Sequence, residues 1–118
     1  MIKNIALLKR KDGISREDFI AYYETKHVPL ILSLFPDIAK YVRNFLSDEG
    51  QRYMFPNASP IDFDVVTEIW LKDRAAYDRF TAIAADPDVM AKVMADEAHF
   101  LDSSRSRMFV VEERASNI

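Results

Sequence analysis

Cysteine is absent from the 118-residue sequence, and glycine occurs only twice, at Gly13 and Gly50. The lack of cysteine excludes disulfides, thiolate catalysis and cysteine-ligated metal centres. Two isolated glycines cannot form the glycine-rich loops that cradle phosphates, so nucleotide chemistry is not expected. No apolar run approaches the ~20 residues that a membrane-spanning helix needs. These absences leave a globular domain without thiol or nucleotide chemistry.

Neither sign of charge dominates, because the net charge is -3 and acidic and basic residues are interspersed. Nucleic-acid binding needs a basic patch, and the short clusters at residues 9–11 and 105–107 are typical of solvated strand ends. The first residues, MIKNIALLKRKDG, lack the cleavage site of a signal peptide. We therefore expect one domain, residues 1–118, located in the cytoplasm, with neither nucleic acid nor a membrane as a partner.

Residues 15–34, SREDFIAYYETKHVPLILSL, predict an amphipathic helix that carries one of the two histidines. Ser15 can cap its N-terminus. One stripe of the helical wheel should face the core, and it holds Ile20, Tyr23, His27, Ile31 and Leu34. Pro29 leaves the carbonyl of Thr25 without its helical partner, so the helix should loosen beside His27. A titratable imidazole on a buried face is the main functional lead.

The rest of the chain predicts a ferredoxin-like fold of the α+β class. Strand patterns cover residues 2–10, 39–47, 64–71 and 108–112, and helix patterns run from about 73 to 84 and from about 87 to 100. The order strand, helix, strand, strand, helix, strand is the split βαβ arrangement with a four-stranded antiparallel sheet. Residues 48–62 have no period and predict a long loop, which is a candidate lid.

Several of the expected strands are apolar on both faces, which one layer of helices does not explain. In residues 64–71, for example, Val66 and Trp70 alternate with Val65 and Ile69. Helices on one side of a four-stranded sheet cover only one of its faces. We therefore expect the uncovered face to pack against the sheet of an identical subunit, in a homodimer.

Two carboxylates of the third expected strand are candidate partners for His27. Asp64 and Glu68 should share a face with Trp70, because side chains alternate along a strand. A histidine and a carboxylate beside a cavity can supply a general base and a general acid. Two alternatives stay open: His27 can be a core histidine bonded to a carbonyl or to Tyr23, and Glu68 can form a salt bridge across the sheet to Arg43 or to an arginine of the last strand.

Other candidate sites receive less support from the residues. His99 resembles a cation placed at a helix C-terminus. Tyr53 and Phe55, in the long loop, are the aromatic residues most suited to line a ligand pocket. A single histidine with one or two acids supplies too few ligands for a metal site, so we expect no metal.

Four segments resemble the EthD family of the dimeric α+β barrel superfamily: IALLKRKDGISREDFIAYYETKHVPL, YVRNF, FDVVTEIWL and the ending DEAHFLD to MFVVEE. The resemblance covers nearly the whole chain and is most specific at F-x-x-Y-Y-E-x-x-H-x-P-L. It matches His27 to the family's motif histidine and Asp64 and Glu68 to its third-strand acids. It also matches the acidic segment before the last strand, which holds Asp96, Phe100 and Asp102. Relatives often have glycine at the position of Val65. The larger valine side chain should narrow the pocket expected beside Asp64.

The resemblance implies a dimeric barrel with a pocket between helix and sheet in each subunit. Relatives include dehydratases of fungal polyketide pathways and proteins associated with ether degradation, while the wider superfamily adds cofactor-free monooxygenases, lactone isomerases, cyclases and haem enzymes. Fold alone does not select among these reactions.

Our leading hypothesis is an enzyme without a cofactor, a lyase, dehydratase or isomerase that acts on an aromatic or cyclic carbonyl compound. His27 is the expected general base, Asp64 or Glu68 orients the imidazole or returns the proton, and Tyr23 donates to a developing oxyanion. The residues expected to contact the substrate are Asn44, Tyr53, Phe55, Glu68 and Trp70. The alternatives are a cofactor-free monooxygenase of a phenolic substrate and a non-catalytic metabolite-binding protein; haem binding is least favoured.

Overall fold

The computed structural model describes residues 1–47 and 55–118 of the chain. Its strands form one antiparallel four-stranded sheet in the order β2-β3-β1-β4. The strands are β1 (Ile2–Leu8), β2 (Ile38–Phe45), β3 (Val65–Leu71) and β4 (Arg107–Val111). This sheet and the order of its connections confirm the predicted ferredoxin-like arrangement.

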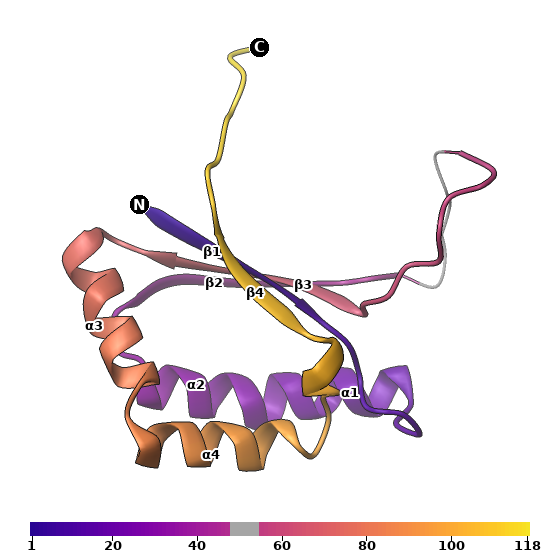
Figure 1. The fold of residues 1–118 in the computed structure, drawn as a ribbon, viewed down its shortest axis with the longest axis horizontal. Helices are drawn as coiled ribbons and strands as arrows, with labels where there is room; N and C mark the ends of the chain where they lie inside the picture. Colours follow the sequence, from indigo (N-terminus) through magenta and orange to yellow (C-terminus); the bar gives the residue numbers. More distant parts are fainter. Residues whose placement is uncertain (48–54) are drawn as a thin grey trace.

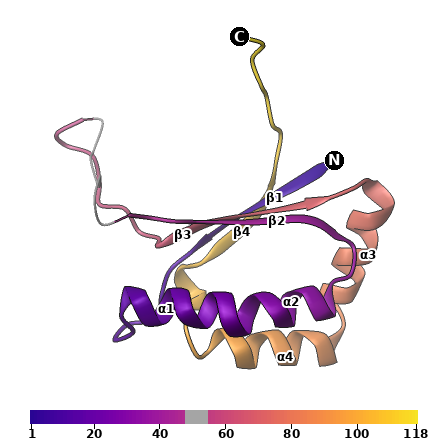
Figure 2. The same cartoon turned by 180° about the vertical axis from the view of Figure 1, so that it is seen from behind.

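The helices lie on one face of the sheet. The first helical region consists of α1 (Arg16–Tyr22), a π-helical turn η1 (Tyr23–His27) and α2 (Val28–Leu34). The second consists of α3 (Arg74–Ala84), α4 (Pro87–Glu97) and the short 3₁₀ turn η2 (Ser103–Arg105). Figures 1 and 2 show α1, α2 and α4 running below the sheet, with α3 at one end of it. None of the described helices is long and apolar enough to cross a membrane.

The first helical region follows the sequence closely. The hydroxyl of Ser15 accepts the amide N–H of Asp18 at 3.1 Å, as expected of an N-cap. The predicted loosening beside His27 is confirmed, because residues 23–27 adopt π-helical geometry and the N–H of Val28 reaches back to the carbonyl of Tyr23. Such single turns often mark functional sites.

The core fills the space between the sheet and the helices. One cluster of buried residues consists of Ile31, Phe35, Ile69, Leu71, Ala76, Phe80 and Val93. A second consists of Phe19, Tyr23, Val65, Phe100 and Leu101. Val65, Thr67, Ile69 and Leu71 of β3 all face the helices and are buried.

The opposite side of the sheet carries no helix, and we call it the open face. Glu68 and Trp70 of β3 lie there beside Ile5 and Lys3 of β1, their partners in the strand register. Phe109 of β4, which pairs with Ile5, is 43% exposed. The chain ends and residues 55–62 also extend away from the helices (Figures 1 and 2).

Candidate functional site

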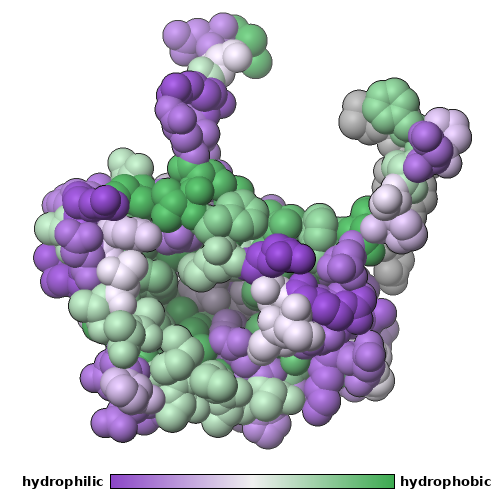
Figure 3. All heavy atoms as spheres, viewed as in Figure 1, coloured by the Kyte–Doolittle hydropathy of each residue, from purple (hydrophilic) through white to green (hydrophobic). Residues whose placement is uncertain are grey.

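A cavity of about 300 Å³ lies between the sheet and the helices. Its walls come from β1, β2, β3, the first helical region, α3, α4 and the segment from Leu101 to Met108. The space-filling view shows a hollow on the side where the strands meet the helices (Figure 3). Most lining side chains are apolar, and the polar ones include Tyr23, His27, Thr67 and Glu97. A volume of this size is at the lower end of small-molecule sites.

His27 reaches this cavity from the π-turn and is paired with Asp96 of α4. The distance between His27 Nδ1 and Asp96 Oδ2 is 2.5 Å, and both residues are buried. An ionised carboxylate can only accept hydrogen bonds, so Nδ1 carries the proton that is donated to Asp96. The neutral imidazole then has its free electron pair on Nε2. This tautomer leaves Nε2 able to accept a proton.

Asp96 is held at both of its carboxylate oxygens. Its Oδ1 accepts the hydroxyl of Tyr22 at 2.9 Å, while its Oδ2 accepts from His27. Burial, the bond to Asp96 and the negative charge of Asp96 raise the pKa of Tyr22 to about 12. Tyr22 therefore stays a neutral donor, and it fixes the carboxylate that in turn orients the imidazole of His27.

The surroundings of His27 favour its neutral form. The rings of Tyr23 and Phe100 lie with their centroids 4.9 Å from that of the imidazole. Burial lowers the pKa of His27 below its ordinary value, and the hydrogen bond to Asp96 opposes this shift. A neutral imidazole with a fixed tautomer can act as a general base near pH 7.

Three hydroxyl groups form a second polar element of the cavity wall. The Tyr23 hydroxyl lies 2.6 Å from the Thr67 hydroxyl, and it also interacts with the hydroxyl of Tyr41. The pKa values of Tyr23 and Tyr41 are both raised, mainly because the two hydroxyl groups are buried. Tyr23 and Tyr41 are therefore neutral at physiological pH and can donate hydrogen bonds.

The structure places Glu68, Asn44 and Trp70 on the open face, on the other side of the sheet from His27. Glu68 is 2.7 Å from the Lys3 ammonium and accepts from the Asn44 amide at 3.1 Å. The expected pairing of Glu68 with His27 is therefore wrong. The alternative of a salt bridge across the sheet is correct, but its cation is Lys3 rather than Arg43, which pairs with Glu24, or an arginine of the last strand. Lys3 and Lys40 each lie 4.6 Å from the Trp70 ring.

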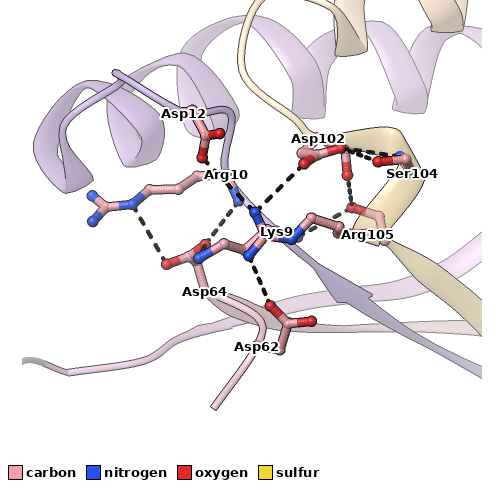
Figure 4. A network of polar contacts seen from close by, with 9 residues as sticks. Lys9, Arg10, Asp12, Asp62, Asp64, Asp102, Ser104 and Arg105 are labelled. Atoms are coloured by element: carbon pink, nitrogen blue, oxygen red, sulfur yellow. Dashed lines mark hydrogen bonds and ion pairs between the residues drawn. The ribbon is translucent and has the colours of Figure 1, made fainter. Parts of the chain in front are cut away.

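The expected pairing of Asp64 with His27 is also wrong. Asp64 accepts the backbone N–H of Arg10 at 2.8 Å, and the side chains of Lys9 and Arg10 both lie 3.5 Å from its carboxylate (Figure 4). It borders a separate cavity of about 70 Å³ beside α1. Asp64 therefore ties the end of β1 to the start of β3, away from the imidazole.

Of the two loop aromatics, Tyr53 lies outside the described residues. Phe55 is 65% exposed, in a segment that points away from the helices (Figure 1). The described part of the expected lid, residues 55–62, therefore does not cover the cavity. It is instead tied to η2 through Asp62, which accepts from Arg105 at 2.9 Å (Figure 4).

Reasoning from strand spacing missed both acids that accompany His27. Asp96 and Glu97 lie at the end of α4, and only the family resemblance drew attention to Asp96. A signal was present, because Val89, Val93, Asp96 and Phe100 share one face at helical spacing, which puts an acid on the buried stripe. Within residues 1–47 and 55–118, no three histidine or acidic side chains converge as metal ligands.

Comparison with solved structures supports the same fold. An EthD family protein from Bacillus halodurans superposes with a TM-score of 0.64 at 17% identity, covering 97% of this chain and 99% of that one. HapK from Hahella chejuensis superposes with a TM-score of 0.61 at 16% identity, covering 100% of this chain and 97% of that one. A dimeric protein of unknown function with a ferredoxin-like fold, from Bacteroides fragilis, superposes with a TM-score of 0.56 at 14% identity, covering 95% of each chain. At these identities the likeness concerns the fold alone.

Comparison of the sequence gives a more specific result. No curated protein matches the chain significantly. The model of the EthD domain, however, matches residues 11–104, which include the π-turn with His27, all of β3 and the acids at the end of α4. That match spans most of the sequence and includes both the π-turn and α4, which carry His27 and Asp96. This chain belongs to the EthD domain family.

Proposed function

We propose that this protein is a cofactor-independent enzyme, either a lyase such as a dehydratase or an isomerase, that removes a proton next to the carbonyl of a small aromatic or cyclic compound. The observation that carries the proposal is the buried pair of His27 and Asp96 at the wall of an apolar cavity of about 300 Å³. A cavity of this size and lining suits a compact ring system rather than a long or highly charged molecule.

His27 is the proposed base. Its Nε2 takes the proton from the carbon next to the carbonyl, and the imidazolium that forms keeps its Nδ1–H on Asp96. The pairing strengthens when the ring becomes charged, because a charged donor then meets a carboxylate in a site of low polarity. Asp96 thus stabilises the charged imidazole more than the neutral one, which lowers the barrier to proton transfer.

Tyr23 is the proposed donor to the enolate oxygen that develops during this step. Its hydroxyl has one proton, and at 2.6 Å from Thr67 either hydroxyl can be the donor. When Thr67 and Tyr41 both donate to the Tyr23 hydroxyl, the proton of Tyr23 is free for the substrate. Such a donor, aimed at the atom where negative charge develops, is a common means of stabilising a transition state.

The test uses 1-tetralone, a small bicyclic ketone, in D₂O, with exchange of its α-protons followed by NMR. We expect the enzyme to accelerate exchange over buffer and His27→Ala to lose about 10²-fold to 10⁴-fold, the usual contribution of a general base. His99→Phe is the matched control, because it keeps an aromatic ring stacked on Tyr22 while removing the other imidazole, which does not line the cavity. Full exchange by His27→Ala would contradict the proposal, as would oxygen uptake during turnover of a true substrate.

We also propose that the protein is a homodimer in which two open faces pack together. The open face carries apolar side chains of β1, β3 and β4 that no helix covers, including Ile5, Val66 and Phe109. Solved ferredoxin-like proteins from Bacteroides fragilis, Thermobifida fusca and Jannaschia are described as dimeric. Light scattering at micromolar concentration should give twice the mass of one chain, and Trp70→Glu should lower it; a monomeric mass for the wild type would contradict the dimer.

A further inference from the structure

The cavity has two chemically different ends. The hydroxyls of Tyr23 and Thr67 and the imidazole of His27 line one end, where the proposed proton abstraction takes place. The other end carries apolar side chains from the first helical region, β3, α3 and α4, and we call it the apolar arm. The apolar arm is formed by Ile31, Phe35, Ile69, Phe80, Ala84 and Val93.

The spacing of residues along the first helical region sets the direction of the apolar arm. Tyr23, His27, Ile31 and Phe35 line the cavity at intervals of four residues. At 1.5 Å per residue these positions span about 18 Å. Ile69 of β3 belongs to the same buried cluster as Ile31 and Phe35, so strand and helix enclose the same space. The apolar arm therefore starts beside His27 and runs away from the hydroxyl of Tyr23.

The apolar arm offers a ligand neither a charge nor a hydrogen-bonding side chain. All of its residues except Ala84 are buried. The rings of Phe35 and Phe80, with centroids 4.9 Å apart, lie at its far end. Glu97 and Arg107, which also line the cavity, are not part of the apolar arm. A charged group placed there would lose its hydration without gaining a partner, so the apolar arm suits a hydrocarbon group.

We propose that the substrate carries an apolar substituent, such as a short alkyl chain, on the side of its ring remote from the carbonyl group. When the carbonyl oxygen meets Tyr23 and the neighbouring carbon meets Nε2 of His27, the apolar arm is the space left for the remote side of the ring. This inference rests on the function proposed above, because that function fixes the position of the carbonyl. It adds the chemical class of the substituent, which the reaction itself does not specify.

The test compares three ketones that differ only at the remote position of the ring: acetophenone, 4′-butylacetophenone and 4-acetylbenzoate. Exchange of the methyl protons next to the carbonyl in D₂O gives kcat/KM, and ligand-observed NMR gives the dissociation constant without turnover. Each buried methylene is worth about threefold to fourfold in affinity. We therefore expect the butyl group to increase kcat/KM and affinity by about 10-fold to 100-fold, and 4-acetylbenzoate to bind more weakly than acetophenone.

Ala84→Leu tests whether the butyl group occupies the apolar arm. Ala84 is the smallest side chain of the apolar arm, so leucine at this position fills space that the substituent needs. We expect the ratio of the affinities for 4′-butylacetophenone and acetophenone to fall about tenfold. Ala82→Leu, at an exposed alanine of the same helix, is the matched control and should keep the wild-type ratio. If Ala84→Leu misfolds by circular dichroism, Ala84→Val replaces it and should lose a smaller part of the ratio.

The outcomes separate this inference from the function on which it rests. Equal affinity of the wild type for acetophenone and 4′-butylacetophenone, or the same affinity ratio in Ala84→Leu, would overturn the apolar arm as the site of the substituent. Tighter binding of 4-acetylbenzoate than of acetophenone would overturn its apolar character. If the butyl group strengthens binding through Ala84 while none of the ketones exchanges faster than in buffer, the proposed function fails and the apolar arm stands as a binding site.

Discussion

On the helix-facing side of β3, Thr67 meets the hydroxyl of Tyr23 at the wall of a cavity, whereas on the open face Glu68 is held by Lys3 and Asn44. Both faces of β3 also carry apolar residues, so hydrophobicity alone does not distinguish them. They differ in how polar groups are partnered. At the cavity on the helix-facing side the polar groups are neutral hydroxyls and the pair of His27 and Asp96, while on the open face the partners of Glu68 are Lys3 and the amide of Asn44.

Residue type alone therefore does not mark a reactive group in this molecule. Lys3 and the amide of Asn44 lower the pKa of Glu68, so this acid stays ionised and occupied. Burial instead lowers the pKa of His27 and raises that of Glu97, so the cavity favours the uncharged form of each group. Groups whose charges are not compensated by lysine or arginine are the ones available for proton transfer.

The largest effect should come from the aromatic cluster behind His27. Phe100 is fully buried and packs against the rings of Phe19, Tyr23 and His27. We expect Phe100→Ala to lower the free energy of unfolding by about 3–5 kcal/mol, through lost burial and the cavity left behind. Urea unfolding followed by circular dichroism measures this loss.

Phe109→Ala is the matched variant on the open face, where the side chain is 43% exposed. It should change the unfolding of a single subunit much less and instead weaken association between subunits. If Phe109→Ala lowered the free energy of unfolding equally at micromolar and at far lower protein concentration, the contrast between the two faces would be contradicted.

The next effect concerns the tautomer of His27. In Asp96→Asn the amide can donate to Nδ1, which favours a proton on Nε2 and blocks the proposed base. We expect α-proton exchange of 1-tetralone to fall by about 10²-fold. An unchanged exchange rate, with the fold intact by circular dichroism, would show that Asp96 does not orient the base.

The sequence predicted the first helical region well because its signals are local. The Ser15 cap, the stripe through His27 and the loosening caused by Pro29 all depend on residues within a few positions of one another. The positions of the strands along the chain followed from the same kind of local pattern, since apolar alternation marks a strand wherever it lies in the sheet.

The pairing of Glu68 with His27 was wrong because it depends on which face of β3 the helices cover. Both faces of that strand are apolar, so alternation grouped Glu68 with Trp70 correctly and still gave no way to tell which face was inside. Asp96 lies 69 residues from His27 in the sequence, and only the packing of α4 against the first helical region brings them together.

A smaller effect should appear in the pH dependence of stability. The folded protein binds a proton at His27 less readily than the unfolded chain does, because burial lowers the pKa of His27. The free energy of unfolding should therefore fall as the pH drops below about 6.5, the ordinary pKa of histidine, until the folded pKa is passed. Subtracting the pH dependence of the free energy of unfolding of His27→Gln isolates the contribution of His27 from that of the carboxylates. Identical slopes for the wild type and His27→Gln would contradict the prediction.

The smallest effect should come from Glu68→Gln on the open face. The ion pair with Lys3 is partly exposed, and pairs of this kind contribute little to stability. Exchange of 1-tetralone should stay within about twofold of the wild-type rate, since Glu68 does not line the cavity. A loss comparable to that of Asp96→Asn would mean that the open face, rather than the helix-facing side, holds the reactive site.

The role of His27 as the base is tested most sharply by the protonation of its two ring nitrogens, read by ¹⁵N NMR of histidine-labelled protein near neutral pH. The structure predicts a proton on Nδ1, donated to Asp96, and a bare Nε2 whose signal shifts when 1-naphthol is added as a cavity ligand. The signals of His99 should not respond in this way. A proton on Nε2, or an Nε2 signal that ignores the ligand, would contradict the assignment of His27 as the base.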